Sequence, residues 1–232
     1  MTRDATQLVD GRRRILDAAA AVFAESGFAG ARIDEIAARA GINKAMVYYH
    51  VGGKEELYEV MISELFDRII GSLRAAVAAV ATPDEKIRAV VRTIADTVQH
   101  NPNLPPVMLR EIASGGHSLP ANVLRKIKGV FEIVWEILEE GSRSGAFRKT
   151  DPVITQMLIG GGMILLVAGT PVRNRIRAMR EKDDGVKSGP EDLIGEVSEL
   201  LLHGISKVSS TRPKKSAPAA RTTTTRRPAR RK

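Results

Sequence analysis

The chain has 232 residues, of which 43% are hydrophobic and 27% are charged, and none is cysteine. This composition is ordinary for a globular protein with a sizeable core, and the lack of cysteine excludes disulfides, thiolate metal sites and cysteine nucleophiles. The first residues contain no apolar run followed by a small-residue cleavage site, so we expect no secretory signal and predict a cytoplasmic protein.

The formal net charge of +9 is concentrated near the C-terminal end. From Ser206 onward the sequence has 10 Lys and Arg residues and no Asp or Glu, which leaves 26 basic and 27 acidic residues elsewhere. A nearly neutral body therefore carries a basic tail. Such a tail either binds a polyanion or is a solvated end without a role, and its low-complexity composition predicts disorder over 209–232.

Helical periodicity extends through the chain and strand signals are scarce, so we predict an all-α fold of about nine helices. Gly27 is expected to end the first helix in the left-handed conformation, Gly41 to end the second helix, and Asn43 to cap the third. The expected helices lie at about 7–26, 33–40, 44–50, 54–80, 83–100, 108–113, 120–141, 151–180 and 190–207.

The short helices on either side of the turn RAGIN, between about Ile33 and Val51, form a candidate helix-turn-helix. In this motif the second helix lies in the DNA major groove. Val47 and Val51 are one turn apart and can face inward, together with Ile42 from the turn. Two tyrosines on the opposite face are poorly explained by packing alone, whereas they suit contacts with phosphate and sugar. The outward-facing residues are Lys44, Ala45, Met46, Tyr48, Tyr49 and His50.

The segment GRRRILDAAAAVFAESGFAGARIDEIAARAGINKAMVYYHVGGKEELYEVM resembles the N-terminal DNA-binding domain of the TetR/AcrR family of bacterial transcriptional regulators. The resemblance extends without a gap from Gly11 to about Asp67. It is specific because DEIAARAGI, VYYHV and GGKEEL all occur at the family's spacing. The domains that it implies are a three-helix DNA-binding domain at 9–54 (its motif extending to about 70), a helical effector-binding and dimerisation domain at 55–208, and the basic tail at 209–232.

The resemblance also implies roles for individual residues. Tyr48 and Lys54 match residues that contact phosphates, and amides at the start of the fourth helix can bind the same anion. Alternatively, Tyr48 is a partly buried residue that braces the first helix, Lys54 is an ordinary solvated lysine, and His50 is a structural hydrogen-bonding residue. Tyr49 and His50 match positions that touch the DNA backbone, and Lys44 and Ala45 match positions near base edges.

Two positions depart from the family's pattern. Ala31 and Arg32 stand where the family often has Ser or Thr, whose hydroxyl caps the second helix and meets a phosphate. Arg32 can replace that phosphate contact by its charge, but it cannot cap the helix. Met46 stands where a small or hydroxylated residue is common, and it can contact a thymine methyl group without making a defined hydrogen bond. The departures put the operator sequence in doubt, but not DNA binding.

The segment 152–172 holds 21 uncharged residues, close to the ~20 that span a bilayer. We interpret it as part of a buried helix instead, because it contains Gln156 and three consecutive glycines and keeps a helical apolar stripe. The last helix has its own stripe, from Leu193 to Ile205. The resemblance implies that these two helices pair with their copies in a homodimer, and we expect no membrane partner.

Family members usually hold a small molecule among the middle helices of the larger domain, so the resemblance implies an effector. Apolar side chains in this region predict a hydrophobic effector, such as an acyl chain, an aromatic compound or a drug-like molecule. Each of these side chains is alternatively a plain core residue. The candidate pocket residues are Met108, Leu109, Phe131, Val134, Trp135 and Met163.

No motif in the sequence indicates an enzyme, a metal site or a cofactor. The four histidines are scattered without HExxH spacing, and neither GxSxG nor a Walker sequence occurs. The sequence IGGGM lies inside an apolar helix and follows no strand, so it does not indicate a phosphate-binding loop.

A dimer places two recognition helices about one DNA turn apart, where they read a palindrome. An effector that binds better to another spacing of these helices releases the DNA by linkage. We therefore predict a dimeric repressor that a hydrophobic effector releases from a palindromic operator. The alternatives are an activator or ligand-independent regulator of the same family, and a nonspecific nucleic-acid-binding protein driven by the basic tail.

Overall fold

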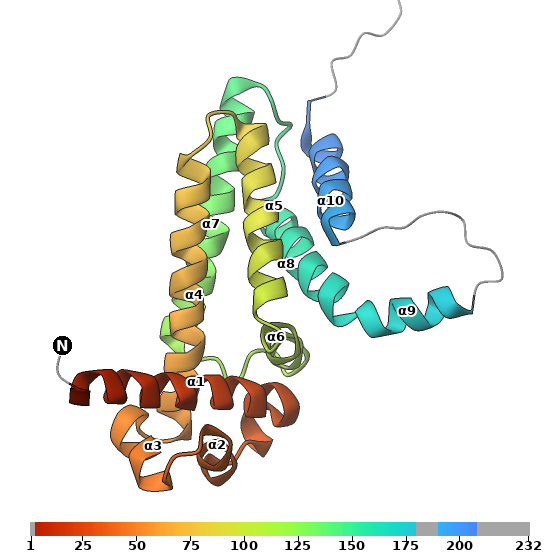
Figure 1. Cartoon of the computed structure of the whole chain (residues 1–232). Helices are drawn as coiled ribbons and strands as arrows, with labels where there is room; N and C mark the ends of the chain where they lie inside the picture. Colours follow the sequence, from red (N-terminus) through yellow and green to blue (C-terminus); the bar gives the residue numbers. More distant parts are fainter. Residues whose placement is uncertain (1–2, 180–189, 208–232) are drawn as a thin grey trace, which may run out of the picture.

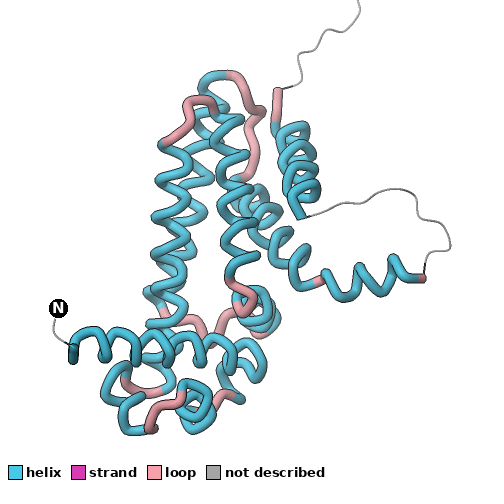
Figure 2. The backbone as a smooth tube through the Cα atoms, in the orientation of Figure 1, coloured by secondary structure: helices cyan, strands magenta, loops and turns pink. Residues whose placement is uncertain are grey.

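The computed structural model describes residues 3–179 and 190–207, and these residues form helices almost throughout (Figure 2). Within them lie ten α-helices and no strand, apart from an isolated bridge between Phe147 and Ser206. The predicted all-α class is confirmed, whereas the predicted disorder of 209–232 lies outside the described residues. The helices are α1 (Arg3–Gly30), α2 (Ile33–Ala40), α3 (Lys44–Val51), α4 (Lys54–Ala78), α5 (Pro83–His100), α6 (Leu104–Ala113), α7 (Ala121–Ser144), α8 (Pro152–Ala168), α9 (Thr170–Ala178) and α10 (Pro190–Ile205).

The head of the molecule consists of α1, α2 and α3, and α1 lies across the foot of α4 (Figure 1). The apolar residues of α1 recur at helical spacing, so they form one stripe that turns inward. Ile36 of α2 and Val47 of α3 pack into the same core and are fully buried. The buried stripe of α1 consists of Ile15, Ala18, Ala19, Val22 and Phe23.

The body of the molecule consists of α4 to α10. Three long helices, α4, α5 and α7, stand side by side in Figure 1 and contact one another, while α8 packs on α5, α6 and α7. α4 belongs to both parts, because Leu57 at its foot and Leu73 near its far end are both fully buried. One continuous apolar core therefore extends from the head into the body through α4.

Several predicted helix boundaries differ from the structure, including the start of α1 at Arg3 and the end of α7 at Ser144. α1 continues past Gly27 to Gly30, although Gly27 has the expected positive φ (φ 69°, ψ 174°) and breaks the helical conformation there. α6 starts at Leu104, four residues before the predicted start, because the prolines of NPNLPP fit a first helical turn. The predicted helix at 151–180 divides at Gly169 into α8 and α9, which meet at a bend of 61°.

The outer face of α8 is apolar and exposed, and α9 extends away from the body (Figure 1). α10 packs mainly on α5. Single exposed apolar side chains are common on protein surfaces, whereas here five of them lie on one helix, α8. Those on α8 and α10 that are at least half exposed are Val153, Ile154, Met157, Leu158, Leu165 and Leu200.

Candidate nucleic-acid interface

The turn between α2 and α3 begins at Gly41 and includes the capping residue Asn43, as the sequence predicts. Gly41 is left-handed (φ 63°, ψ 38°), and its amide donates to the carbonyls at the end of α2. Asn43 caps α3, and its side-chain oxygen accepts a hydrogen bond from the Ala45 amide at 3.0 Å. These two residues fix the direction in which α3 leaves the turn.

The two sides of α3 differ strongly in burial. Val47 is completely buried, and Val51 and Ile42 are half-buried against the same core, as predicted from their spacing. On the outer side Tyr49 is 76% exposed and Tyr48 is 49% exposed. The predicted orientation of α3 is thus confirmed for the tyrosines but not for His50, which was expected to face outward and is half-buried beside α1, and contact of the outer side with DNA stays a prediction. Met46, Lys44 and Ala45 are also exposed.

Lys44, at the start of α3, forms an ion pair with Asp34 of α2, with Nζ 2.7 Å from Oδ1. This hydrogen bond lowers the pKa of Asp34 and raises the pKa of Lys44. Both side chains are about half exposed, so the pair is open to exchange with a phosphate. Asp34 also places one negative charge beside the surface that would face DNA.

Three other predicted DNA contacts have distinct environments. Arg32 is exposed and precedes α2 with extended backbone, and its side chain makes no capping hydrogen bond. His50 is half-buried, lies edge-on to the Tyr49 ring and packs near Gly11 of α1. Lys54 turns inward, because its ammonium lies 4.8 Å from the centre of the Phe28 ring and 3.4 Å from the carbonyl oxygens of Ala29 and Ala31.

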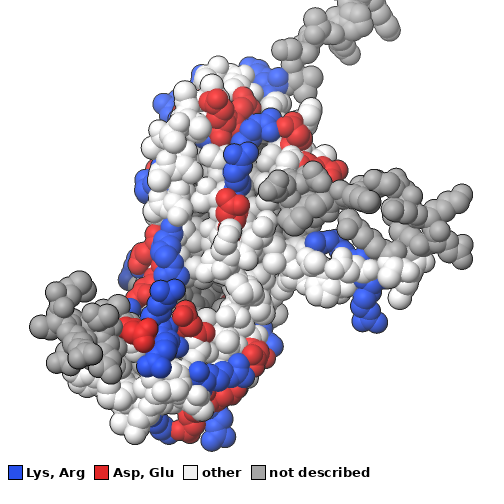
Figure 3. Space-filling view, viewed as in Figure 1, with Lys and Arg blue, Asp and Glu red and all other residues white. Residues whose placement is uncertain are grey.

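Charged side chains are mixed over the face of the molecule in Figure 3, and basic side chains gather where α1 crosses the foot of α4. At this crossing Arg12 of α1 forms an ion pair with Glu64 of α4 at 2.5 Å. Arg13 lies 3.9 Å from Asp17 within α1. This crossing is therefore a first junction between the head and the body, and the ion pair between Arg12 and Glu64 is part of it.

A second junction between the head and the body was not predicted from the sequence. Arg110 of α6 donates hydrogen bonds to the carbonyls of Ala24 and Glu25, near the end of α1. The Tyr58 hydroxyl of α4 donates to Glu111 Oε1 at 2.6 Å. Burial and this hydrogen bond raise the pKa of Tyr58, so its hydroxyl stays protonated and donates. Since these residues are far apart in sequence, only the folded structure reveals the junction.

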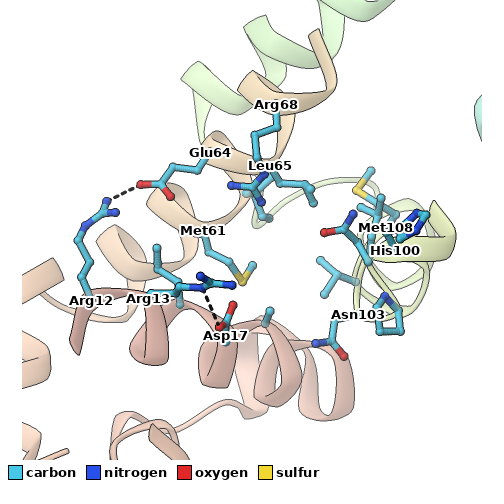
Figure 4. A pocket seen from close by; sticks show the side chains of 17 residues that line it. Arg12, Arg13, Asp17, Met61, Glu64, Leu65, Arg68, His100, Asn103 and Met108 are labelled. Atoms are coloured by element: carbon cyan, nitrogen blue, oxygen red, sulfur yellow. Dashed lines mark hydrogen bonds and ion pairs between the residues drawn. The ribbon is translucent and has the colours of Figure 1, made fainter. Parts of the chain in front are cut away.

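A cavity of about 810 Å³ lies between the two junctions, among α1, α4 and the start of α6 (Figure 4). Its volume lies within the range of small-molecule sites, about 300–1,000 Å³. Leu16, Met61 and Leu65 supply apolar walls, and Arg68 projects from α4 beside them. Met108 lines the cavity on the α6 side.

The other predicted pocket residues do not line this cavity. Val134 and Met163 are buried in the core of the body, and Leu109 and Phe131 are half-buried. Trp135 is 53% exposed, and its indole nitrogen donates to Glu139 at 2.8 Å. The six side chains therefore do not surround one described cavity, and the adjacent residues Val134 and Trp135 lie about 100° apart round α7, on different faces.

Within residues 3–179 and 190–207, no group of three or more His, Cys, Asp or Glu side chains is arranged to hold a metal ion. In the same residues no single helix has the length and apolar character to span a membrane, and α8 reaches that threshold only when combined with the start of α9 across their bend.

Comparison with known families gives two matches along the chain. Residues 15–61 match the family described as bacterial regulatory proteins, tetR family. Residues 80–167 match a tetracyclin repressor-like C-terminal domain. Together these matches cover more than half of the chain and include most of the head, the foot of α4 and most of the body.

Individual relatives agree with this result. The transcriptional repressor NicS of Pseudomonas putida is 27% identical over 199 residues, which are 84% of this chain and 92% of the repressor. The crystal structure of FadR from Bacillus subtilis in complex with stearoyl-CoA is 25% identical, with a TM-score of 0.66, and covers 83% of this chain and 98% of FadR. The ketosteroid regulator KstR2 of Mycobacterium tuberculosis has the same fold, with a TM-score of 0.66 at 22% identity, over 84% of this chain and 95% of KstR2.

Proposed function

The chain belongs to the tetR family of bacterial regulatory proteins and is a DNA-binding transcriptional regulator, and from this premise we propose that it is a dimeric repressor of a palindromic operator. The observation that carries the proposal is α3, which is anchored by the buried Val47 and exposes Tyr48 and Tyr49 on its other side. In the proposed complex α3 lies in the major groove. The residues proposed to contact DNA are Arg32, Lys44, Ala45, Met46, Tyr48, Tyr49, His50 and Lys54.

The proposed contacts differ in what they require of the protein. Tyr48 and Tyr49 are already exposed, so their hydroxyls can donate to phosphates without rearrangement. Lys44 has to exchange Asp34 for DNA. Lys54 has to leave the Phe28 ring and two carbonyls, so the amides at the start of α4 are the more accessible phosphate donors.

We further propose that the exposed apolar faces of α8 and α10 form a two-fold symmetric dimer interface. Grouped apolar side chains favour an interface over a water-exposed surface, and a two-fold axis pairs the same patch on both copies. In analytical ultracentrifugation at micromolar concentration the chain should sediment as a dimer. Leu158→Asp should shift it to a monomer, whereas Leu124→Asp, which alters a similarly exposed leucine on α7, should not. A monomeric wild-type chain would refute the interface.

The proposed effector is hydrophobic. FadR of Bacillus subtilis, which has the same fold, binds stearoyl-CoA in its crystal structure, and KstR2 is a ketosteroid regulator, so apolar compounds are associated with both relatives. We propose that the chain binds DNA and an effector without catalysing a reaction, and that it does so in the bacterial cytoplasm. Met108 is retained as an effector contact, because it lines the described cavity.

A footprint on the DNA that flanks the chain's own gene tests the DNA-binding proposal. We expect two protected half-sites about 10 base pairs apart. Tyr48→Ala should weaken this binding, and in vitro transcription from the protected promoter should fall when protein is added. An increase in transcription would identify an activator instead.

A chain from which Pro213 to Lys232 are deleted separates specific binding from binding by the basic tail. For a regulator the footprint survives, with weaker nonspecific affinity and a shallower salt dependence. Loss of all DNA binding would instead favour a nonspecific nucleic-acid-binding protein driven by the tail.

A further inference from the structure

We infer that the cavity between α1, α4 and α6 binds an amphipathic anion, whose charged group competes with Glu64 for the Arg12 guanidinium. The inference rests on the effector-controlled repressor proposed above, since it names the chemical class and the site of that effector. It rests on three features of the structure: the apolar walls, the cations at their edge, and the ion pair that crosses from the head to the body.

The walls of the cavity suit an alkyl chain. Four residues of α4 that line the cavity, at 61, 62, 65 and 68, follow the spacing of one helix face. The first three are Met, Ile and Leu, and Leu16 of α1 with Val107 of α6 adds apolar surface from the other sides. A flexible apolar group of modest length can therefore contact apolar side chains from three helices.

Cations stand at the edge of these apolar walls. Arg12 and Arg13 come from α1 and Arg68 from α4 (Figure 4). Arg13 already has Asp17 beside it, at 3.9 Å. Among the ion pairs of the described side chains, at 10–176, 178–179 and 194–207, none involves Arg68. Arg68 and Arg12 can therefore bind one anionic group, and arginine's planar donors suit a carboxylate or a phosphate.

The ion pair between Arg12 and Glu64 connects this site to the position of the head. Arg12 lies on α1 and Glu64 on α4, so the pair spans the crossing of head and body. Both side chains are about 40% exposed, and exposed ion pairs are inexpensive to exchange. An anion that takes over Arg12 removes the pair, while its alkyl chain fills the space between α1 and α4. The bound state therefore favours a different angle between head and body.

Titration of the full chain with three ten-carbon probes tests the inference. Decanoate and decyl phosphate carry the proposed anionic group, and decanol has the same alkyl chain without a charge. By calorimetry we expect at least one anion to bind about tenfold or more tightly than decanol. Comparison of the two anions distinguishes a carboxylate ligand from a phosphate ligand. Equal affinities for all three probes, or no binding of either anion, would overturn the inference.

Three variants locate the site, and two of them have opposite expected effects. Arg68→Ala should weaken the favoured anion about tenfold and leave decanol unchanged. Glu64→Gln should strengthen anion binding, because it removes the competitor for Arg12. Ala20→Phe, which projects a ring from α1 into the cavity, should block every probe. Arg92→Ala, an exposed arginine of α5 outside the cavity, serves as the control. Unchanged anion affinity in both Arg68→Ala and Ala20→Phe would overturn the inference, and thermal unfolding of each variant confirms that it folds.

DNA binding by the same preparations separates this inference from the proposed function. The favoured anion should lower the affinity of the wild-type chain for its footprinted DNA, and it should have no such effect on Ala20→Phe. A chain that binds the DNA specifically but no anion keeps the proposed function and refutes the site. A chain that binds the anion at this cavity but no specific DNA refutes the proposed function instead.

Discussion

Replacing Tyr58 with Phe removes a single hydroxyl from the junction between head and body. That hydroxyl donates to Glu111, which is 4% exposed and whose second oxygen has no hydrogen-bond partner among the described residues. The phenylalanine ring can keep the edge-on contact with Phe23, at 4.7 Å between ring centres. The loss is therefore mainly that of a hydrogen bond to a buried carboxyl group, about 2 kcal/mol of unfolding free energy. For a chain of this length it lowers Tm by roughly 4–8 °C.

Urea and thermal unfolding followed by circular dichroism, at one fixed protein concentration, measure this loss. Tyr49→Phe is a matched control, because Tyr49 is 76% exposed and its hydroxyl can bond to water. The control should change the unfolding free energy by less than about 0.5 kcal/mol. A double variant with Glu111→Leu should lose less than the sum of the two single losses. A Tyr58→Phe variant as stable as wild type, or strict additivity in the double variant, would refute the reasoning.

The stability difference between wild type and Tyr58→Phe should also depend on pH in alkaline solution. Burial and the hydrogen bond to Glu111 raise the pKa of Tyr58 in the folded protein. In the unfolded chain the tyrosine pKa is about 10. The stabilisation from the protonated hydroxyl is therefore complete below about pH 10 and is lost as the pH rises towards the higher folded value. The difference in stability between wild type and Tyr58→Phe should be constant at neutral pH and should shrink above about pH 10.

Three further predictions concern packing, capping and charge. Gly141→Ala places a methyl group against the Phe147 ring and should lower the free energy of unfolding in urea by about 1–3 kcal/mol. Gly71→Ala, in open space on α4, is the control and should raise it by about 0.5–1 kcal/mol. Equal effects of the two substitutions would contradict the packing argument. Asn43→Ala removes the cap of α3 and should cost about 1 kcal/mol, measured in the same way. Asp34→Asn removes the carboxylate that pairs with Lys44 at the start of α3, so the affinity for DNA should rise. The slope of log affinity against log salt concentration should steepen by about one phosphate contact. Weaker DNA binding of the variant, measured by fluorescence anisotropy, would contradict this.

Local signals in the sequence predicted most of the helices, because the start and the end of a helix depend on residues near those positions. Gly41 and Asn43 have the conformation and the hydrogen bond expected of them. The break at Gly169 was missed because the uncharged segment 152–172 was interpreted as one helix. A local signal was present, since Pro171 follows Gly169 by two residues and proline favours the first turn of a new helix.

The candidate site was likewise predicted from the sequence only where the signal lies within one helix. The spacing of Val47 and Val51 was enough to predict which side of α3 faces out, since one helix contains all the necessary positions. The environment of Lys54 was not predictable, because it depends on Phe28 and on two carbonyls that only the fold brings near. The cavity has walls from three helices far apart in sequence, so the predicted pocket shares only Met108 with it.

The two junctions hold α1 at separate points, and this arrangement determines what a ligand between them can do. Arg12 and Ala24 are 12 residues apart on α1, which corresponds to about 18 Å along the helix. The junction at Arg110 is held by two hydrogen bonds to backbone carbonyls, while the junction at Arg12 is one exposed ion pair. We therefore expect the proposed ligand to displace the weaker junction and leave the stronger one in place, so that α1 tilts about Ala24 and Glu25 rather than separating from the body. Because α3 packs on α1, such a tilt moves the outer face of α3, and in a two-fold dimer the two movements add to a change in the spacing of the recognition helices.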